Sequence, residues 1–344
     1  MRINFVPLFF VFPFLVSCNH RGDKLNNLPV YIVEKFVDNE LWVDECFSHV
    51  KILPLQLDTN QMIGQVKDVS VAGDIIFLLD EVSATLYSFD RYSGKCLASG
   101  SKRGHGPNEY INPVALSVDA ENLFVLDMPT SRIIRFDKEL NAVGTIAFDF
   151  PASDFMALNG GFLLYNLAPT SEKGKFVYIS SEGEYINSFV FPEKEDDFNN
   201  VLSGGKVFVK NREHEVFAFE SYDDIVYKWD NDSLQPILRM DFGEMGIPAG
   251  MKNDNLNYFE EPYAFAGNIF MLSDMFIPSF FYKSKRYYGF IPFLSRESMF
   301  GTVKERSYGI PFFPRWQHED ELIGVCIREN EYAQEQLMFV FYIH

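Results

Sequence analysis

The stretch that decides the fold is IIFLLD at residues 75–80, followed after a short interval by LYSFD at residues 86–90. The same phrase returns as LFVLD at residues 123–127 and IIRFD at residues 133–137. In both copies the two closing aspartates lie ten positions apart, and the copies are offset by 47 residues. Repetition at a fixed interval indicates an architecture built from one supersecondary unit.

Three weaker copies of this phrase follow along the chain. They are residues 161–166 with 176–180, 216–220 with 226–230, and 269–274 with 280–284. The last two keep the ten-residue spacing, whereas the loop of the first is four residues longer. A nearly continuous apolar run, a polar turn and a partly alternating run predict a hairpin whose first strand is buried on both faces. The acidic or polar residue at each strand end can accept hydrogen bonds from the next turn.

Further strand candidates flank these hairpins, such as residues 66–71 before the first and residues 95–100 after it. Four strands in about 40 to 47 residues are typical of a β-propeller blade. Five complete units can be counted, at about 62–104, 111–150, 152–192, 198–244 and 262–306.

The remainder of the chain, from Tyr308 to His344, contains only about three strands. A strand predicted at residues 50–57 has no unit of its own, and pairing it there would close the ring without exposed sheet edges. We therefore predict an all-β fold, a six-bladed β-propeller of four-stranded antiparallel blades closed by an N-terminal strand. Two β-sandwiches are the alternative, but they would not be expected to share the ten-residue spacing.

Composition excludes two broad classes of protein. The 344 residues are 47% hydrophobic and 23% charged, which is normal for a globular chain and excludes wholesale disorder. The formal net charge of −18 argues against binding that neutralises many phosphates, so we expect no nucleic acid partner. The 36 Phe residues are expected to fill the space between blades.

The N-terminal residues predict the cellular location of the protein. Residues 1–17 combine one Arg, an apolar run too short to span a bilayer and a small residue before Cys18, which predicts a secretory signal peptide. The sequence Leu15-Val16-Ser17-Cys18 resembles a bacterial lipobox, which implies lipidation at Cys18 and attachment to the membrane through that anchor. Residues 18–29 are predicted to form a tether and residues 30–344 the propeller. Asn19, which is not Asp, favours the outer membrane by resemblance to enterobacterial sorting rules.

Three cysteines remain in the predicted mature body: Cys46, Cys96 and Cys326. Their spacing matches no metal-binding motif, and their odd number leaves at least one thiol free. A bridge between Cys46 and Cys326 and burial as small apolar side chains are both open alternatives.

Residues 104–110, GHGPNEY, resemble the G-x-G-P-G-E-Y motif of the six-bladed, NHL-like β-propeller lipoproteins common in Bacteroidota. Residues 53–55 with 62–64 are similar to the opening of that family, and residues 336–342 to its closing strand. The resemblance covers essentially the whole mature chain. It departs at Asn108, where the family has Gly, and at Gln56, where an acid is usual. It implies the fold but no established activity.

Candidate ligand-binding residues come from two regions. One follows the first blade and should lie near a channel mouth; the other includes aromatic and basic residues near the starts of innermost strands. The candidates are Arg103, His105, Glu109, Tyr110, Tyr263, Arg315 and Trp316. For the first group the alternative is a turn that only connects two blades, and for the second it is packing in the core.

No catalytic motif and no metal-ligand spacing occurs in the sequence, so we assign no catalytic residue, no metal ligand and no cofactor. We expect a non-catalytic binding or interaction propeller in the cell envelope, with a small molecule, a glycan or a protein as ligand. The alternative is a propeller-type hydrolase or lyase with a metal-assisted site at the channel mouth. An accessory component of a glycan or protein-uptake assembly is a third reading.

Overall fold

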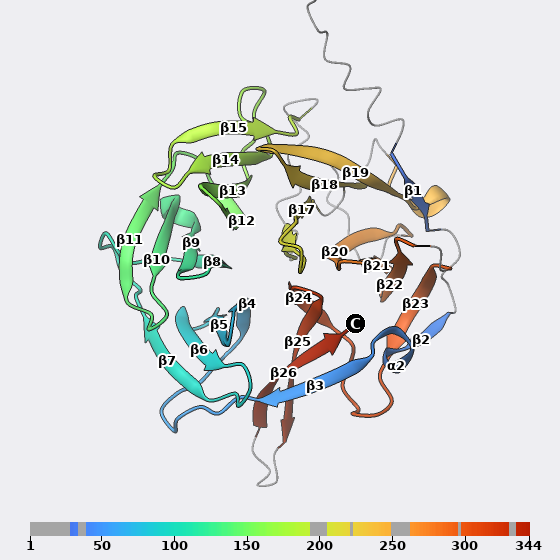
Figure 1. Ribbon diagram of the computed structural model, residues 1–344, viewed down its shortest axis with the longest axis horizontal. Helices are drawn as coiled ribbons and strands as arrows, with labels where there is room; N and C mark the ends of the chain where they lie inside the picture. The colour runs from blue at the N-terminus through green and yellow to red at the C-terminus, as the bar shows by residue number, and fades with distance from the viewer. Residues whose placement is uncertain are drawn as a thin grey trace, which may run out of the picture.

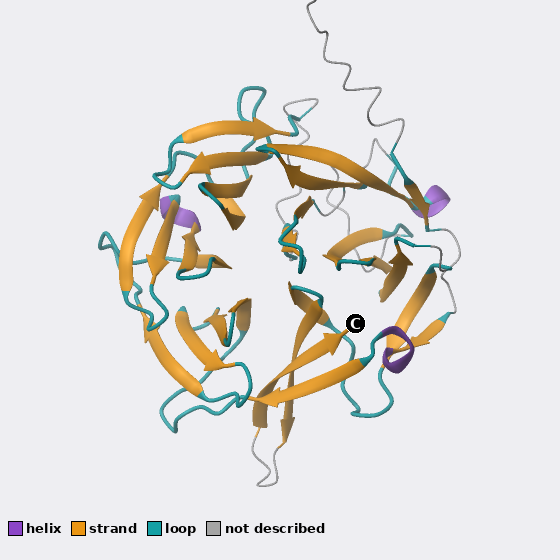
Figure 2. Cartoon of the chain, viewed as in Figure 1, coloured by secondary structure: helices purple, strands orange, loops and turns teal. Residues whose placement is uncertain are grey.

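The computed structural model describes residues 28–33, 39–192, 205–220, 223–248, 262–294, 297–329 and 335–344. Within these ranges the strands form six sheets arranged around a central axis (Figure 1). Almost all regular structure is strand, and the few helical turns are short (Figure 2). The predicted six-bladed β-propeller is therefore confirmed. The predicted signal peptide, Cys18 and nearly all of the tether lie outside the described residues.

Blades 1 to 3 each contain four consecutive antiparallel strands, numbered from the centre outward. Blade 1 comprises β4 (Val66–Ala72), β5 (Ile75–Asp80), β6 (Thr85–Asp90) and β7 (Cys96–Ser101). Blade 2 comprises β8 (Pro113–Val118), β9 (Leu123–Asp127), β10 (Arg132–Phe136) and β11 (Ala142–Ala147). Blade 3 comprises β12 (Ala152–Leu158), β13 (Gly161–Asn166), β14 (Phe176–Ser180) and β15 (Tyr185–Phe189).

Blades 4 to 6 each recruit one strand from the N-terminal segment. Blade 4 comprises β16 (Phe208–Lys210), β17 (Val216–Phe219), β18 (Ile225–Asp230), β19 (Ser233–Asp241) and β1 (Val30–Ile32). Blade 5 comprises β20 (Phe265–Met271), β21 (Met275–Tyr282), β22 (Lys285–Pro292), β23 (Met299–Lys304) and β2 (Glu40–Trp42). Blade 6 comprises β24 (Pro314–His318), β25 (Glu321–Glu329), β26 (Glu335–Ile343) and β3 (His49–Pro54).

Strand β3 closes the ring as predicted. It pairs antiparallel with β26 from Met338 opposite Pro54 to Ile343 opposite His49, so the two ends of the chain share blade 6. The chain then continues to Gln56, which forms a parallel bridge with Lys95 of blade 1. The closing segment thus joins the last blade to the first.

Strands β1 and β2 were not predicted from the sequence. Each pairs in parallel with the outermost strand of a blade, β1 with β19 and β2 with β23 (Figure 1). The helix α2 (Val43–Cys46) follows β2 and leads into β3. With only three residues each, the two strands are too short to produce a periodic pattern.

The repeat copy at residues 269–274 and 280–284 was interpreted wrongly. In blades 1 and 2 the repeated phrases are the second and third strands. In blade 5 the first phrase, residues 269–274, spans the end of β20 and the turn before β21, and the second phrase spans the end of β21. The phrase therefore marks the first hairpin of this blade, because an apolar strand buried on both faces looks the same at either position.

The aspartates at the strand ends accept hydrogen bonds from neighbouring segments, as predicted. Asp80 accepts backbone N–H groups from Gly64 and Gln65 before the blade and from Ser83 in the turn that follows. Asp127 at the same place in blade 2 accepts those of Ile111 and Asn112. Both side chains are buried, so each carboxylate ties the blade to the segment that enters it.

Aromatic rings fill the space between blades. Phe89 of blade 1 meets Phe339 of blade 6, with ring centroids 6.5 Å apart. Phe124 of blade 2 meets Phe162 of blade 3 at 5.0 Å. These pairs account for part of the excess of Phe, because each bulky ring spans the gap between two radially arranged sheets.

The three described cysteines are all free thiols, so the alternative of a bridge between Cys46 and Cys326 is wrong. Cys46 is buried and Cys326 packs against the same apolar cluster. Burial, together with the neighbouring Glu45 and Asp44 carboxylates, raises the pKa of Cys46 to about 12. The cysteines therefore act as small apolar side chains.

Candidate functional site

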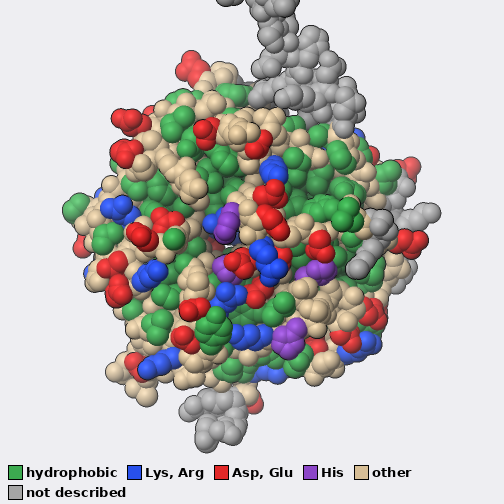
Figure 3. All heavy atoms as spheres, in the orientation of Figure 1, with side chains coloured by type: hydrophobic (Ala, Val, Ile, Leu, Met, Phe, Trp, Pro, Cys, Tyr) green, Lys and Arg blue, Asp and Glu red, His purple; other side chains and the backbone are tan. Residues whose placement is uncertain are grey.

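A cavity of about 680 Å³ occupies the centre of the ring. Its walls come from the innermost strands β4, β8, β12, β16 and β24. Its rim includes residues from the turns that connect first and second strands, among them Gly73, Asp119, Gly160, His214 and Glu319. We call the side of the propeller that carries these turns the turn face. Figure 3 shows acidic, basic and histidine side chains gathered around the centre of the molecule.

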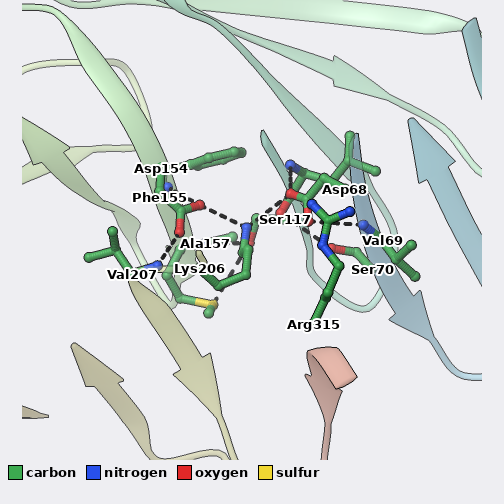
Figure 4. Close-up of polar contacts among 12 residues, drawn as sticks. Asp68, Val69, Ser70, Ser117, Asp154, Phe155, Ala157, Lys206, Val207 and Arg315 are labelled. Carbon is green, nitrogen blue, oxygen red and sulfur yellow. Dashed lines mark hydrogen bonds and ion pairs between the residues drawn. The ribbon is translucent and has the colours of Figure 1, made fainter. Parts of the chain in front are cut away.

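The deep end of the cavity holds a buried ion cluster. The ammonium of Lys206, the residue two positions before β16, lies 2.9 Å from Asp68 Oδ2 and 2.7 Å from Asp154 Oδ1. Figure 4 shows Lys206 reaching between the two aspartates, with Arg315 approaching from β24. Both carboxylates are buried.

The two aspartates occupy equivalent positions in blades 1 and 3. Each aspartate comes directly after a shift of register between the first and second strands of its blade. After the shift, Asp68 lies opposite Leu79, and Asp154 lies opposite Tyr165. Each also accepts the N–H of its own next residue and one N–H from the following blade. That second donor is Leu116 N at 2.6 Å for Asp68 and Val207 N at 2.7 Å for Asp154. The carboxylates therefore join neighbouring blades at the channel wall.

The cluster has one ammonium for two carboxylates. Burial alone would lower the pKa of Lys206, but Asp154 and Asp68 outweigh it and hold this pKa above its ordinary value. Burial raises the pKa of Asp154 above its ordinary value. The nearby Asp68 raises this pKa further, and the ammonium of Lys206 opposes both effects. Because both carboxylates also accept backbone N–H groups, we assign Lys206 as charged and as the link between blades 1, 3 and 4.

Arg315 lies beside this cluster. Its guanidinium is 4.7 Å from the ring centroid of Trp316, and Nη1 donates to the carbonyl of Val66 at 3.1 Å. Burial lowers the pKa of Arg315, with Asp68 and Glu81 opposing that effect. Within the described ranges it has no ion-pair partner within 4.0 Å.

Three further basic or imidazole side chains line the cavity nearer to the turn face. Lys210 ends β16, and burial lowers its pKa against the attraction of Asp119 and Glu319. His318 ends β24, and burial beside Arg91 and Lys210 lowers its pKa to about 4, so the ring is neutral at pH 7. His214 lies in the turn after β16, with a backbone φ of 61°.

The segment 104–110 has a clear structural role. Gly106 N donates to Glu109 Oε2 at 2.7 Å, and a Cβ added to Gly104 would lie 2.0 Å from that oxygen and displace the Glu109 carboxylate. Tyr110 is fully buried, and its hydroxyl donates to the carbonyl of Ala84 at 2.8 Å. Arg103 and His105 are exposed. The segment connects β7 to β8.

The structure brings together only part of the predicted set. Arg315 and Trp316 line the cavity, and Trp316 is also buried in the core. Arg103, His105, Glu109 and Tyr110 belong to the connecting segment and do not line it. Tyr263 precedes β20, is partly buried and does not line it either.

Sequence reasoning missed four charged residues at the channel: Asp68, Asp154, Lys206 and Lys210. The sequence did contain an indication of the aspartates, because each lies within an inner strand made mostly of apolar or small residues, VKDVSVA and ASDFMAL. Aligning the blades by first strand places Ala115 of blade 2 and Trp316 of blade 6 at the same position. No repeat marks Lys206.

In the part of the chain that the structure describes, no group of three or more His, Cys, Asp or Glu side chains is arranged to hold a metal ion. None of the described helices is long and apolar enough to cross a bilayer.

A comparison with protein families shows the family to which this chain belongs. The model of a domain of unknown function, DUF4934, matches residues 29–337. The chain belongs to the DUF4934 family. This agrees with the predicted kinship to six-bladed propellers, whereas the lipoprotein and NHL-like parts of that resemblance stay predictions. No curated protein matches the sequence.

Two solved structures share the fold of this DUF4934 chain. A protein of Bacteroides fragilis that is named as exported has a TM-score of 0.72 at 15% identity, covering 90% of this chain and 99% of that one. A DUF4221 family member from Bacteroides vulgatus has a TM-score of 0.54 at 11% identity, covering 86% of this chain and 96% of that one. At these identities the likeness establishes architecture alone.

Proposed function

We propose that this protein is a lipid-anchored component of the cell envelope whose propeller binds a small solute in its central channel without transforming it. The observation that carries the binding role is the cavity of about 680 Å³, which falls within the volume range of about 300 to 1,000 Å³ common for small-molecule sites. Its lining combines apolar side chains with basic, acidic and neutral polar groups that could orient a solute.

The envelope location rests on different support. Residues 1–18 have the pattern of a lipoprotein signal, and a fold relative from Bacteroides fragilis is named as exported. We propose lipidation at Cys18 and the outer membrane as the site of attachment. The short polar tether would hold the propeller close to the bilayer.

Blocking the cavity tests the binding role. The mature chain would be screened by thermal unfolding against small-molecule fractions of the producing cells, beside Ala120→Trp and Leu97→Trp. Ala120 is exposed and lines the rim of the cavity, whereas Leu97 is exposed on the outer strand β7. We expect a stabilising fraction for the wild type and Leu97→Trp, and none for Ala120→Trp.

Two outcomes would count against this proposal. Stabilisation of all three proteins alike would place the ligand outside the channel. Conversion of the bound solute during the assay would favour the hydrolase or lyase alternative.

A further inference from the structure

Among the described residues, the charged side chains that line the channel at the level of the inner strands are cations, although the chain as a whole has a net charge of −18. The carboxylates of Asp68 and Asp154 pair with Lys206 and do not line the cavity. The charged side chains that line it at the level of the inner strands are Lys206, Lys210 and Arg315. The two lining acids, Asp119 and Glu319, belong to turns at the rim. Asp119 Oδ1 accepts the N–H groups of Glu121 and Asn122, so this carboxylate is engaged within its own turn.

Two of these three cations have no ion pair among the described residues, although Asp68 and Glu81 attract Arg315, and Asp119 and Glu319 attract Lys210, from farther away. Lys206 is matched by Asp68 and Asp154. Lys210 and Arg315 have no carboxylate within 4.0 Å among the described residues, and the one hydrogen bond of the Arg315 side chain goes to a backbone carbonyl. Both side chains are half-buried at the cavity wall, and an anionic ligand in the channel would give each of them a close partner of opposite charge.

Lys210 and Arg315 lie at different depths. Lys210 is the last residue of β16, directly before a turn of the turn face, whereas Arg315 is the second residue of β24, four positions before Glu319 in the equivalent turn. Both strands run toward the turn face. At about 3.3 Å per residue, the two backbone positions are separated by roughly 10 Å along the axis.

The wall between these two levels combines apolar and polar groups. Its apolar residues include Val69, Val71, Leu116, Met156 and Phe208, and its polar residues include Ser70, Ser117 and Gln317. A ligand that meets both cations must span this stretch, where an apolar segment between its two ends can contact the apolar residues.

We propose that the channel binds an elongated organic dianion, with acidic groups at the two ends of an apolar segment, and that Lys210 and Arg315 are its counter-ions. This inference rests on the proposed function of the channel as a solute site. It adds the chemical class of the solute and the residues that select it.

Octanedioate, octanoate and octanediol are matched probes with two, one and no acidic groups. Binding would be followed by the fluorescence of Trp316, which lines the cavity, in proteins whose Trp42 and Trp229 are replaced by Phe. Each charge-assisted hydrogen bond is expected to contribute about tenfold or more to affinity. Octanedioate should therefore bind at least about tenfold more tightly than octanoate, and octanediol most weakly.

Variants assign the effect to the two cations. Lys210→Met and Arg315→Met should each weaken octanedioate binding about tenfold or more and leave octanediol binding unchanged. Lys138→Met, at an exposed position outside the cavity, should alter none of the three. Thermal unfolding of each variant would show that it is folded, and Lys210→Met alone tests the proposal if Arg315→Met is not.

The outcomes separate the two proposals. Equal affinity for octanedioate and octanediol, lost in Ala120→Trp, would keep the channel as a solute site and overturn the dianion. Equal affinity for octanedioate and octanoate would overturn the requirement for two acidic groups. If no probe binds and no cell fraction stabilises the protein, both proposals fall.

Discussion

Replacing Lys206 should strongly lower the free energy of unfolding, because its ammonium pairs with two buried carboxylates. Lys206→Met would leave Asp68 and Asp154 without their ion-pair partner, and Arg315 would be the cation that remains beside them. Breaking a buried ion cluster by removing one partner typically costs about 3 to 5 kcal/mol. Urea unfolding should show a loss of this size, while Lys138→Met, at an exposed position, should unfold like the wild type.

A loss below about 1 kcal/mol for Lys206→Met would place this cluster among weak, solvent-screened ion pairs. It would also contradict the role assigned to Lys206 as a link between three blades. The hydrogen bonds that the N–H groups of Leu116 and Val207 donate to the two aspartates would then suffice to join those blades.

His318 gives the protein a predictable response to acid. Burial beside Arg91 and Lys210 lowers its pKa from 6.5 to about 4. Between these values the unfolded chain binds a proton that the folded chain does not, so stability falls as the pH decreases through this window. His318→Gln removes this contribution, and its urea midpoint should decline less between pH 6.5 and 4. Parallel pH profiles for the two proteins would refute the assignment.

At the scale of the element, strand β3 is expected to contribute far more than β1. Strand β3 forms six register pairs with β26 and carries the buried Leu53, whereas β1 forms three pairs and has two exposed residues. Deleting residues 50–57 should therefore abolish the cooperative thermal transition, because the ring is left open at blade 6. A chain that starts at Asn39 and lacks β1 should retain it.

An unchanged melting temperature after deletion of residues 50–57 would show that the ring does not depend on this closure. A loss of folding on removal of β1 alone would show that this outer parallel strand contributes more to stability than we predict. Circular dichroism of both proteins during heating distinguishes these results.

Elements with a strong pattern were predictable from sequence, and short ones were not. The runs at residues 75–80 and 123–127 are long and apolar enough to identify strands buried on both faces, and the unpaired run near residue 50 identified the closure. Strands β1 and β2 are three residues long and pair through the backbone at the edge of a blade. Such pairing places little demand on side chains, so it leaves no pattern to read.

The site was less predictable than the fold for a physical reason. The channel joins side chains from five blades, and Lys206 meets Asp68 across 138 positions of sequence. Arg315 and Trp316 were found because they are conspicuous residue types near the start of an inner strand. The glycines of residues 104–110 suggested a functional motif. In the structure, Gly104 and Gly106 leave room for the side chain of Glu109.

At the scale of the whole molecule, the anchor and the channel can be related through strand direction. Strand β1 runs parallel to β19, a fourth strand, and fourth strands run away from the turn face. Val30 pairs with Arg239 near the end of β19, so β1 lies toward the face opposite the turn face. Twelve tether residues span at most about 40 Å, so lipidation at Cys18 would keep that opposite face within this reach of the bilayer.

Cys18→Ala tests the anchor itself. Without the acyl chains nothing else in the proposal holds the protein at the membrane, so the variant should move from the membrane fraction to the soluble fraction after cell lysis. Immunoblotting of the two fractions measures this, and Cys96→Ala serves as the matched control. Continued sedimentation of Cys18→Ala with membranes would contradict the lipoprotein assignment.

The central claim is that the channel of this propeller is a ligand site. The most direct measurement is a crystal structure of the mature protein bound to the solute that stabilises it in the thermal screen. The account predicts density for that solute along the inner strands, with acidic groups at Lys210 and Arg315. Density for the solute on an outer blade surface, with only water in the channel, would contradict it.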